Sequence, residues 1–246
     1  MGSNNKTALI TGAAKRIGAK LTEALHQSGY DVAIHYRSAA AEAQELADRL
    51  NQKRPNSAKT FSADLNNLEQ LNQLAEDILG HFGQLNLLIN NASTFYPTPI
   101  DETSLHQWDE LINSNLRAPY FLCATLSKTL RESNGCIINM IDIHAQRGLP
   151  GYPIYSIAKA GLEMLTKSLA KELAPQVRVN GISPGAILWP EQEVSSTEKA
   201  QILDKVLLGR LGVEEDLAQA AIYLSQAEYI TGQILAVDGG KSLFSH

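Results

Sequence analysis

Lys6-Thr-Ala-Leu-Ile-Thr11, followed directly by Gly12-Ala-Ala-Lys-Arg16-Ile-Gly18, indicates the fold more clearly than any other segment of the sequence. Its first part is a short apolar run typical of a buried strand. Its second part is a glycine-containing turn, from which a helical pattern continues to Gly29. This order aims backbone N–H groups and a positive helix end at a phosphate. The usual dinucleotide fingerprint has a further glycine where this chain has Arg16, so an ordinary strand-to-helix turn stays an alternative.

Further apolar runs alternate with helical stretches along the 246 residues. Strands are predicted at 6–11, 31–36, 58–63, 86–90, 135–141, 177–182 and 233–237. Most of these runs are continuously apolar, which favours a parallel sheet covered on both faces. We expect one α/β domain over 1–246: a Rossmann-type doubly wound parallel sheet of about seven strands with helices on both faces. Residues 187–210 have no clear period.

Composition excludes several classes of protein. The net charge is −5 and no dense Lys/Arg cluster is present, which argues against nucleic-acid binding. No apolar run approaches the ~18 residues of a membrane span, and the first strand follows Met1 too closely for a signal peptide. Cys123 and Cys136 lack metal or redox spacing. We therefore expect a cytoplasmic protein without a metal site and with a small-molecule substrate.

Tyr155-Ser-Ile-Ala-Lys159 opens a helical pattern that runs to Leu173, with the stop at Pro175. Residues four apart share one helix face, so the phenol and the ammonium should lie side by side. A phenol has a pKa near ~10. A neighbouring cation is expected to lower the pKa of Tyr155 and make it a general acid/base.

Several motifs occur in the order that marks a known family. They are Thr11-Gly12-xxx-Arg16-x-Gly18, Asp64-Leu65, Asn90-Asn91-Ala92-Ser93, Asn115, Tyr155-xxx-Lys159 and Pro184-Gly185. On these motifs the chain resembles the short-chain dehydrogenase/reductase family over nearly its whole length. Further stretches are similar to those of pteridine reductases: TGAAKRIG (11–18), HYRSAAAEA (35–43), RPNSA (54–58), NNASTFYPTP (90–99) and Asp142 before GYPIYSIAK (151–159). The resemblance implies a homotetramer and a mobile substrate-binding loop at 187–210.

The second predicted strand ends His35-Tyr36-Arg37-Ser38 without an acidic residue. An acid there would bind the ribose hydroxyls of NAD, whereas a guanidinium and a hydroxyl would bind a 2′-phosphate. We expect the cofactor NADPH, with the choice between Arg37 and Ser38 as main phosphate ligand open. His35 itself is interpreted as structural. The predicted cofactor-binding residues are Gly12, Arg16, Ile17, Gly18, His35, Tyr36, Arg37, Ser38, Asp64, Leu65, Asn91, Ala92, Ser93, Tyr155, Lys159, Pro184 and Gly185.

The resemblance also assigns a catalytic set. Tyr155 would donate the proton, Lys159 would assist it and bind the nicotinamide ribose, and Asn115, within the helical stretch 105–131, would hold a water that links Lys159 to solvent. Most family members have a serine where this chain has Asp142. An ionised carboxylate cannot donate to a carbonyl, so Asp142 favours a pterin; a simple strand-end cap is the alternative.

Phe95 would stack on a flat substrate beside the nicotinamide. The predicted substrate-binding residues are Arg16, Ser93, Phe95, Asp142, Tyr155, Leu188 and Trp189, with Tyr96 as a weaker candidate and His144 interpreted as structural. The resulting hypothesis is NADPH-dependent reduction of a pterin or folate. A reductase of a carbonyl such as a 3-oxoacyl thioester, and a non-catalytic NADPH-binding sensor, are the alternatives.

Overall fold

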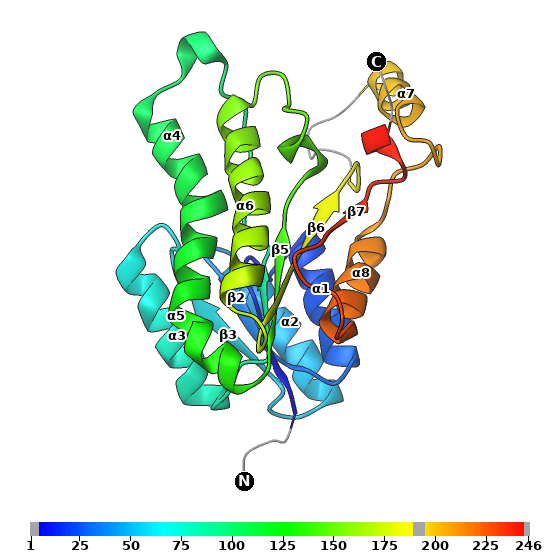
Figure 1. Ribbon diagram of the computed structural model, residues 1–246. Coiled ribbons are helices and arrows are strands. Elements are labelled where there is room, and N and C mark those ends of the chain that lie inside the picture. The colour runs from blue at the N-terminus through cyan, green and yellow to red at the C-terminus, as the bar shows by residue number, and fades with distance from the viewer. Residues whose placement is uncertain (1–4, 189–194, 244–246) are drawn as a thin grey trace.

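The apolar runs form one parallel sheet between two layers of helices (Figure 1). The computed structural model describes residues 5–188 and 195–243. The strands are β1 Thr7–Ile10, β2 Asp31–Tyr36, β3 Ala58–Ser62, β4 Leu87–Asn90, β5 Cys136–Met140, β6 Arg178–Pro184 and β7 Ile234–Val237. They pair in the order β3-β2-β1-β4-β5-β6-β7. The predicted doubly wound sheet of about seven strands is confirmed.

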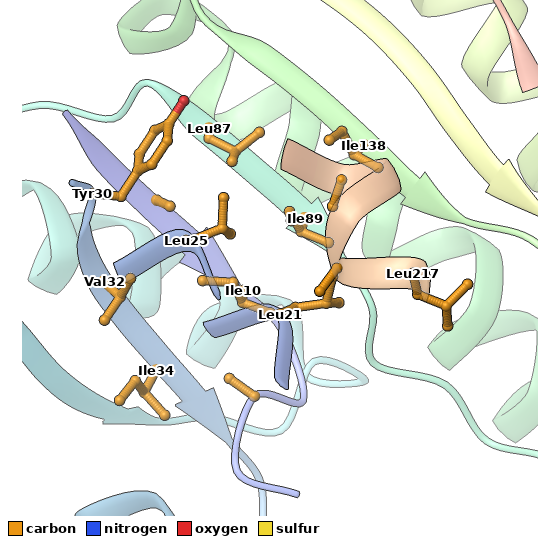
Figure 2. Close-up of a cluster of buried hydrophobic side chains, with 14 of the residues drawn as sticks. Ile10, Leu21, Leu25, Tyr30, Val32, Ile34, Leu87, Ile89, Ile138 and Leu217 are labelled. Atoms are coloured by element: carbon orange, nitrogen blue, oxygen red, sulfur yellow. The ribbon is translucent and has the colours of Figure 1, made fainter. Parts of the chain in front are cut away.

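Two helical layers cover the faces of the sheet. Successive side chains of a strand point to opposite faces, so Ile10 packs in one layer and Leu9 in the other. On the Ile10 side, Leu21 and Leu25 of α1 and Leu217 of α8 pack on the strands (Figure 2). The helices are α1 Arg16–Gln27, α2 Ala40–Lys53, α3 Leu68–Phe82, α4 Leu105–Ile112, α5 Ala118–Glu132, α6 Pro153–Glu172, α7 Ser196–Asp204 and α8 Glu214–Gln226.

The direction of strand addition reverses at β1. This strand pairs with β2 on one side and with β4 on the other, with Ile10 opposite both Ile34 and Ile89. The chain therefore builds outward to β3 and then crosses back to β4. The loops after β1 and β4 turn away from each other at such a point, and the crevice between them is where open α/β sheets bind ligands.

Two predicted segments differ from the structure. The stretch 105–131 is divided into α4 and α5 by a π-helical turn over Asn113–Arg117. The stretch 187–210, expected to lack regular structure, contains α7. Ser195 begins α7 with a capping box to Glu198. The described side chains of α7 are mostly exposed, so no apolar period marked this helix in the sequence.

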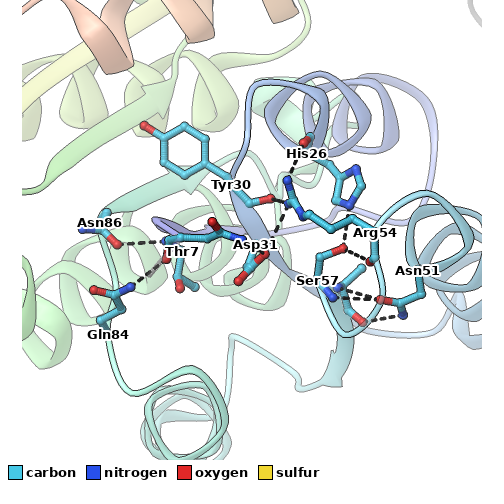
Figure 3. Close-up of polar contacts among 11 residues, drawn as sticks. Thr7, His26, Tyr30, Asp31, Asn51, Arg54, Ser57, Gln84 and Asn86 are labelled. Atoms are coloured by element: carbon cyan, nitrogen blue, oxygen red, sulfur yellow. Dashed lines mark hydrogen bonds and ion pairs between the residues drawn. The ribbon is translucent and has the colours of Figure 1, made fainter. Parts of the chain in front are cut away.

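The RPNSA stretch (54–58) lies near the starts of β2 and β3, at the end of the sheet opposite the crevice. Figure 3 shows its polar contacts. The Arg54 guanidinium donates to the backbone oxygens of His26 and Tyr30 and forms an ion pair with Asp31 at 3.2 Å. The side-chain oxygen of Asn51 accepts the backbone N–H of Ser57 at 3.0 Å. These contacts join the ends of α1 and α2 to the starts of β2 and β3. They give the RPNSA stretch, which contains none of the predicted site residues, a structural role.

The described residues also bear on two expected absences. Within 5–188 and 195–243, no helix is long and apolar enough to cross a membrane. Over the same residues, no three His, Cys, Asp or Glu side chains group as a metal site would require. Cys123 and Cys136 are buried unpaired thiols, and burial raises their pKa values to about 12 and about 11.

Candidate active site

A cavity of about 470 Å³ opens at the carboxyl ends of β1, β2, β3 and β4. Its lining brings together Gly12, Arg16, Ile17, Gly18, His35, Tyr36, Arg37, Ser38, Asp64, Leu65, Asn91, Ala92 and Ser93, all of them predicted cofactor residues. It adds Ala14, Lys15, Ala39, Ala63, Asn66, Thr94 and Ser114, which the sequence did not single out although most adjoin the motifs.

The remaining predicted cofactor residues lie outside this lining. Tyr155 and Lys159 are on α6, and Pro184 and Gly185 are at the end of β6. The backbone N–H of Gly185 donates to the Val237 oxygen at 3.0 Å. Pro184 and Gly185 therefore lie at the carboxyl end of β6, next to β7 and outside the lining of the cavity.

The glycine turn forms a close-fitting cradle at the start of α1. Gly12 has a φ of +61°, in the left-handed region that favours glycine. A Cβ on Gly18 would lie 2.1 Å from the Gly12 oxygen, so only a glycine fits there. Arg16 has a φ of +51° and begins α1, which explains why the usual fingerprint has a glycine at its position.

His35 holds the turn against β2. Its Nδ1 accepts the Gly12 N–H at 3.1 Å, and its Nε2 is 3.1 Å from the Ala63 oxygen. Burial lowers the pKa of His35 to about 4. The ring is therefore neutral at physiological pH, with Nε2–H as the donor to Ala63. This geometry gives His35 the structural role expected of it, at the edge of the cavity.

Two asparagines at the end of β4 organise the surroundings. The Asn91 side-chain amide donates to the Thr11 and Gly12 oxygens at 2.9 and 3.1 Å. The Asn90 amide donates to Asn139 of β5 at 2.8 Å, and the Asn139 amide donates to Thr166 of α6 at 2.9 Å. The side chains of Asn90, Asn139 and Thr166 are all buried. Their two hydrogen bonds link β4 through β5 to α6, the helix that carries Tyr155 and Lys159.

Three cationic side chains line the cavity: Lys15, Arg16 and Arg37. Arg37 and Ser38 are exposed at the end of β2. Lys15, which the sequence reading overlooked beside Arg16, forms an ion pair with Glu42 at 2.6 Å. Cations around a glycine cradle and a helix N-terminus fit the phosphates of a dinucleotide.

Tyr155 is hydrogen-bonded to Asp142 at the end of β5. The Tyr155 hydroxyl donates to Oδ2 of Asp142 at 2.9 Å. The other carboxylate oxygen, Oδ1, accepts the backbone N–H of His144 at 2.8 Å and lies 2.7 Å from His144 Nδ1. Asp142 does cap the short 3-10 turn that follows it, but its second oxygen is directed at the tyrosine. The cap and the tyrosine contact are therefore both present.

The expected lowering of the Tyr155 pKa is wrong. Burial, followed by the charge of Asp142 and its hydrogen bond, raises the pKa of Tyr155 well above its usual value. The Lys159 ammonium lies 5.6 Å from the centre of the Tyr155 ring and donates instead to the Met140 oxygen at 2.8 Å. A carboxylate in direct contact outweighs a more distant cation. Tyr155 therefore keeps its proton throughout the physiological pH range.

Burial has the opposite effect on Lys159. The side chain is 3% exposed, and desolvation lowers its pKa to about 8 while the charge of Asp142 opposes this shift. For Asp142, burial alone would raise the pKa, but hydrogen bonds from His144, with a further bond from Tyr155, lower it below its usual value. Near neutral pH the group thus consists of a phenol, a carboxylate and an ammonium.

Asn115 lies fully buried in the π-helical turn beside α6. Its side-chain amide donates to the Thr94 and Leu111 oxygens, both at 2.9 Å. Its Oδ1 has no hydrogen-bond partner among the described residues. A buried acceptor without a partner fits the water-holding role expected from the resemblance, which stays a prediction.

Phe95 packs on two tyrosines of the site. Its ring stacks on Tyr152 at 4.6 Å and 7°, and meets Tyr155 edge to face at 4.8 Å. The Phe95 side chain is 53% exposed. One face of Phe95 is thus covered by Tyr152, a residue that the sequence did not single out. A flat ligand would use the exposed remainder of the ring.

The weaker substrate candidates separate in the structure. Ser93 is exposed in the cavity wall. The Tyr96 hydroxyl donates to Glu110 at 2.8 Å, and burial together with Glu110 raises its pKa to about 12. Leu188 packs against the hydrophobic core on the α1 side. Trp189 lies outside the described residues.

Comparison with known proteins agrees with this geometry. A family profile described as enoyl-(acyl carrier protein) reductase matches residues 12–242. The chain belongs to the short-chain dehydrogenase/reductase family. Pteridine reductase 1 of Leishmania tarentolae is 39% identical, over 96% of each chain. The 3-oxoacyl-[acyl-carrier-protein] reductase of Staphylococcus aureus is 32% identical over 96% of this chain and 97% of its own, and an uncharacterized oxidoreductase of Bacillus subtilis is 34% identical over 96% and 98%.

Membership in the short-chain dehydrogenase/reductase family makes the chain an oxidoreductase that uses a nicotinamide cofactor and a small-molecule substrate. The glycine cradle and the three cations fit such a cofactor. The side chains that could move a proton, Tyr155, Asp142 and Lys159, adjoin one another at the neighbouring end of β5 and on α6.

Proposed function

We propose that the chain is an NADPH-dependent reductase of a pterin, of the dihydrobiopterin, dihydromonapterin or dihydrofolate type. The observation that carries this proposal is the hydrogen bond from the Tyr155 hydroxyl to the Asp142 carboxylate at 2.9 Å. A carboxylate suits the amino group and ring nitrogens of a pterin, because both can donate hydrogen bonds to it. The exposed part of the Phe95 ring, beside Tyr155, suits a flat heteroaromatic ring.

Each residue of the pair has a defined task in this reaction. When bound, the reduced nicotinamide supplies a hydride to a ring carbon of the substrate. Tyr155 holds its proton because burial and Asp142 raise its pKa, and it donates that proton to the adjacent ring nitrogen. Asp142 accepts hydrogen bonds from the substrate and from Tyr155, and the Lys159 charge stabilises the phenolate that forms.

The preference for NADPH rests on charge at the end of β2. No acidic side chain occurs at 35–38, whereas Arg37 and Lys15 line the same cavity. A 2′-phosphate would bind these cations and would be repelled by a carboxylate in their place. The proposal also includes the cytoplasmic location and the homotetramer that the family resemblance implies.

Reduction of a 3-oxoacyl thioester is the second candidate. Its support is the similarity to the Staphylococcus aureus 3-oxoacyl-[acyl-carrier-protein] reductase. Against it stands the lowered pKa of Asp142, because an ionised carboxylate accepts but does not donate the hydrogen bond that polarises a carbonyl.

The test is NADPH oxidation by the wild type and by Asp142→Ser, with dihydrobiopterin, dihydromonapterin, dihydrofolate, a β-keto ester and a 3-oxoacyl thioester. We expect pterin turnover by the wild type and a marked loss in Asp142→Ser, with NADPH affinity unchanged. Ser62→Ala, a change on β3 outside the site, is the control. Turnover of the keto substrates alone by the wild type would replace the pterin proposal with the second candidate.

A further inference from the structure

His144 contacts the Asp142 carboxylate through two groups. It lies in the 3-10 turn Ile143–Ala145 after β5. Its backbone N–H donates to Oδ1 of Asp142 at 2.8 Å, and its ring Nδ1 is 2.7 Å from the same oxygen. Both side chains are 23% exposed. Two short contacts on one oxygen leave Oδ2 as the oxygen that receives the Tyr155 hydroxyl at 2.9 Å.

The ionisation of Asp142 determines which atom carries the hydrogen in the contact between His144 Nδ1 and Asp142 Oδ1. Burial opposes its ionisation, but the bonds from His144 and Tyr155 outweigh burial and lower the pKa of Asp142. An ionised carboxylate only accepts hydrogen bonds, so Nδ1 of His144 must carry a hydrogen and donate it. The charges of Lys159 on α6 and of Lys241, after β7, also interact with this carboxylate. The Lys159 ammonium directs its hydrogen bond at the Met140 oxygen instead.

We propose that His144 is a positioning residue for the proton-donating pair. Its two donors fix the rotation of the Asp142 carboxylate, so that Oδ2 points at the Tyr155 hydroxyl and holds the tyrosine in its donating orientation. Without the ring donor, the carboxylate retains one backbone bond and rotates more freely about its terminal torsion. His144 acts through Asp142 and needs no contact with substrate or cofactor. It does not line the cavity.

The test rests on the proposed catalytic role of Tyr155 and Asp142 and compares two substitutions of His144. Asparagine retains an N–H donor at the position of Nδ1, whereas leucine keeps side-chain bulk without any donor. We expect His144→Leu to lower kcat about tenfold, as the loss of one charge-assisted bond would. His144→Asn should stay within about threefold of the wild type. The KM for NADPH should be unchanged in both, and His106→Leu, at an exposed position of α4, is the matched control.

A double-mutant cycle with Asp142→Ala tests whether His144 acts through Asp142. In that background, His144→Leu should change kcat by less than about twofold. Three outcomes would each overturn the positioning role. They are equal kcat losses in His144→Leu and His144→Asn, no loss in His144→Leu, and a full further loss from His144→Leu in the Asp142→Ala background. The cycle uses whichever panel substrate the wild type reduces. If the pterin proposal fails, the wild type reduces a different substrate. If the positioning role of His144 fails, His144→Leu and His144→Asn do not differ in kcat.

Discussion

The buried Lys159 predicts a loss of activity at alkaline pH. Burial lowers the pKa of its ammonium to about 8. From that value, roughly 90% of the side chains are charged at about pH 7 and roughly 10% at about pH 9. In the proposed mechanism the charged form stabilises the phenolate left on Tyr155, so activity should fall as pH rises through the pKa of Lys159. We expect kcat/KM for NADPH to fall about tenfold per pH unit above the pKa of Lys159.

The structure also predicts how the alkaline limb of the pH profile, the fall of kcat/KM above the pKa of Lys159, should shift in a variant. The charge of Asp142 raises the pKa of Lys159 and so opposes the effect of desolvation. Asp142→Asn removes that charge, so the limb should move to lower pH even though the absolute rate also falls. Asp48→Asn, on the exposed side of α2, should leave the limb in place.

The assay is the initial rate of loss of reduced-nicotinamide absorbance between about pH 6 and about pH 10, at limiting NADPH. Under this condition kcat/KM reports the ionisation of the free enzyme. A wild-type profile that is flat across this range would refute the role of the Lys159 charge. A limb that stays in place or moves upward in Asp142→Asn would refute the electrostatic coupling between the two residues.

Three further changes test the rest of the site. Tyr155→Phe should lower kcat by about 10²–10⁴-fold with little change in NADPH affinity by fluorescence titration; turnover within about twofold of wild type would contradict its role as proton donor. Arg37→Asp should lower the NADPH/NADH ratio of kcat/KM by about tenfold or more, because it removes a phosphate partner and adds a like charge; an unchanged ratio would place the phosphate elsewhere. Gly18→Ala should weaken NADPH binding, because the new Cβ would lie 2.1 Å from a backbone oxygen, whereas Gly80→Ala, with nothing within 4 Å, should not.

Phe95 provides a test of the substrate itself. Phe95→Ala should weaken a flat diaminopteridine inhibitor by roughly 1–2 kcal/mol in the presence of NADPH, through the lost ring surface. Affinity for NADPH alone should be unchanged, since Phe95 does not line the cofactor cavity. Equal inhibitor binding by wild type and variant in a calorimetric titration would remove the stacked-pterin arrangement.

The order of the elements, the parallel sheet and the location of the crevice could be predicted from the amino-acid sequence. Continuous apolar runs mark strands buried on both faces, and glycines mark a turn that no other residue can form, as at Gly18. These signals are contained within short segments, so they can be read without knowing which segments meet. The gathering of the first thirteen cofactor candidates around one cavity follows from strand order alone, because carboxyl ends of parallel strands share one edge.

Properties that depend on burial and on contacts between distant residues could not be predicted without the tertiary structure. The spacing of Tyr155 and Lys159 correctly places them on one helix, but spacing does not reveal that the Tyr155 hydroxyl is hydrogen-bonded to Asp142 while the ammonium lies 5.6 Å from the ring centre. The direction of the Tyr155 pKa shift was therefore wrong from sequence. The Phe95–Tyr152 stack joins segments from two different loops. The His144 ring contacts the other oxygen of Asp142, Oδ1, at 2.7 Å, and the sequence does not show which way that ring turns. Electrostatic effects depend on distance and desolvation in three dimensions, and a local sequence pattern contains neither.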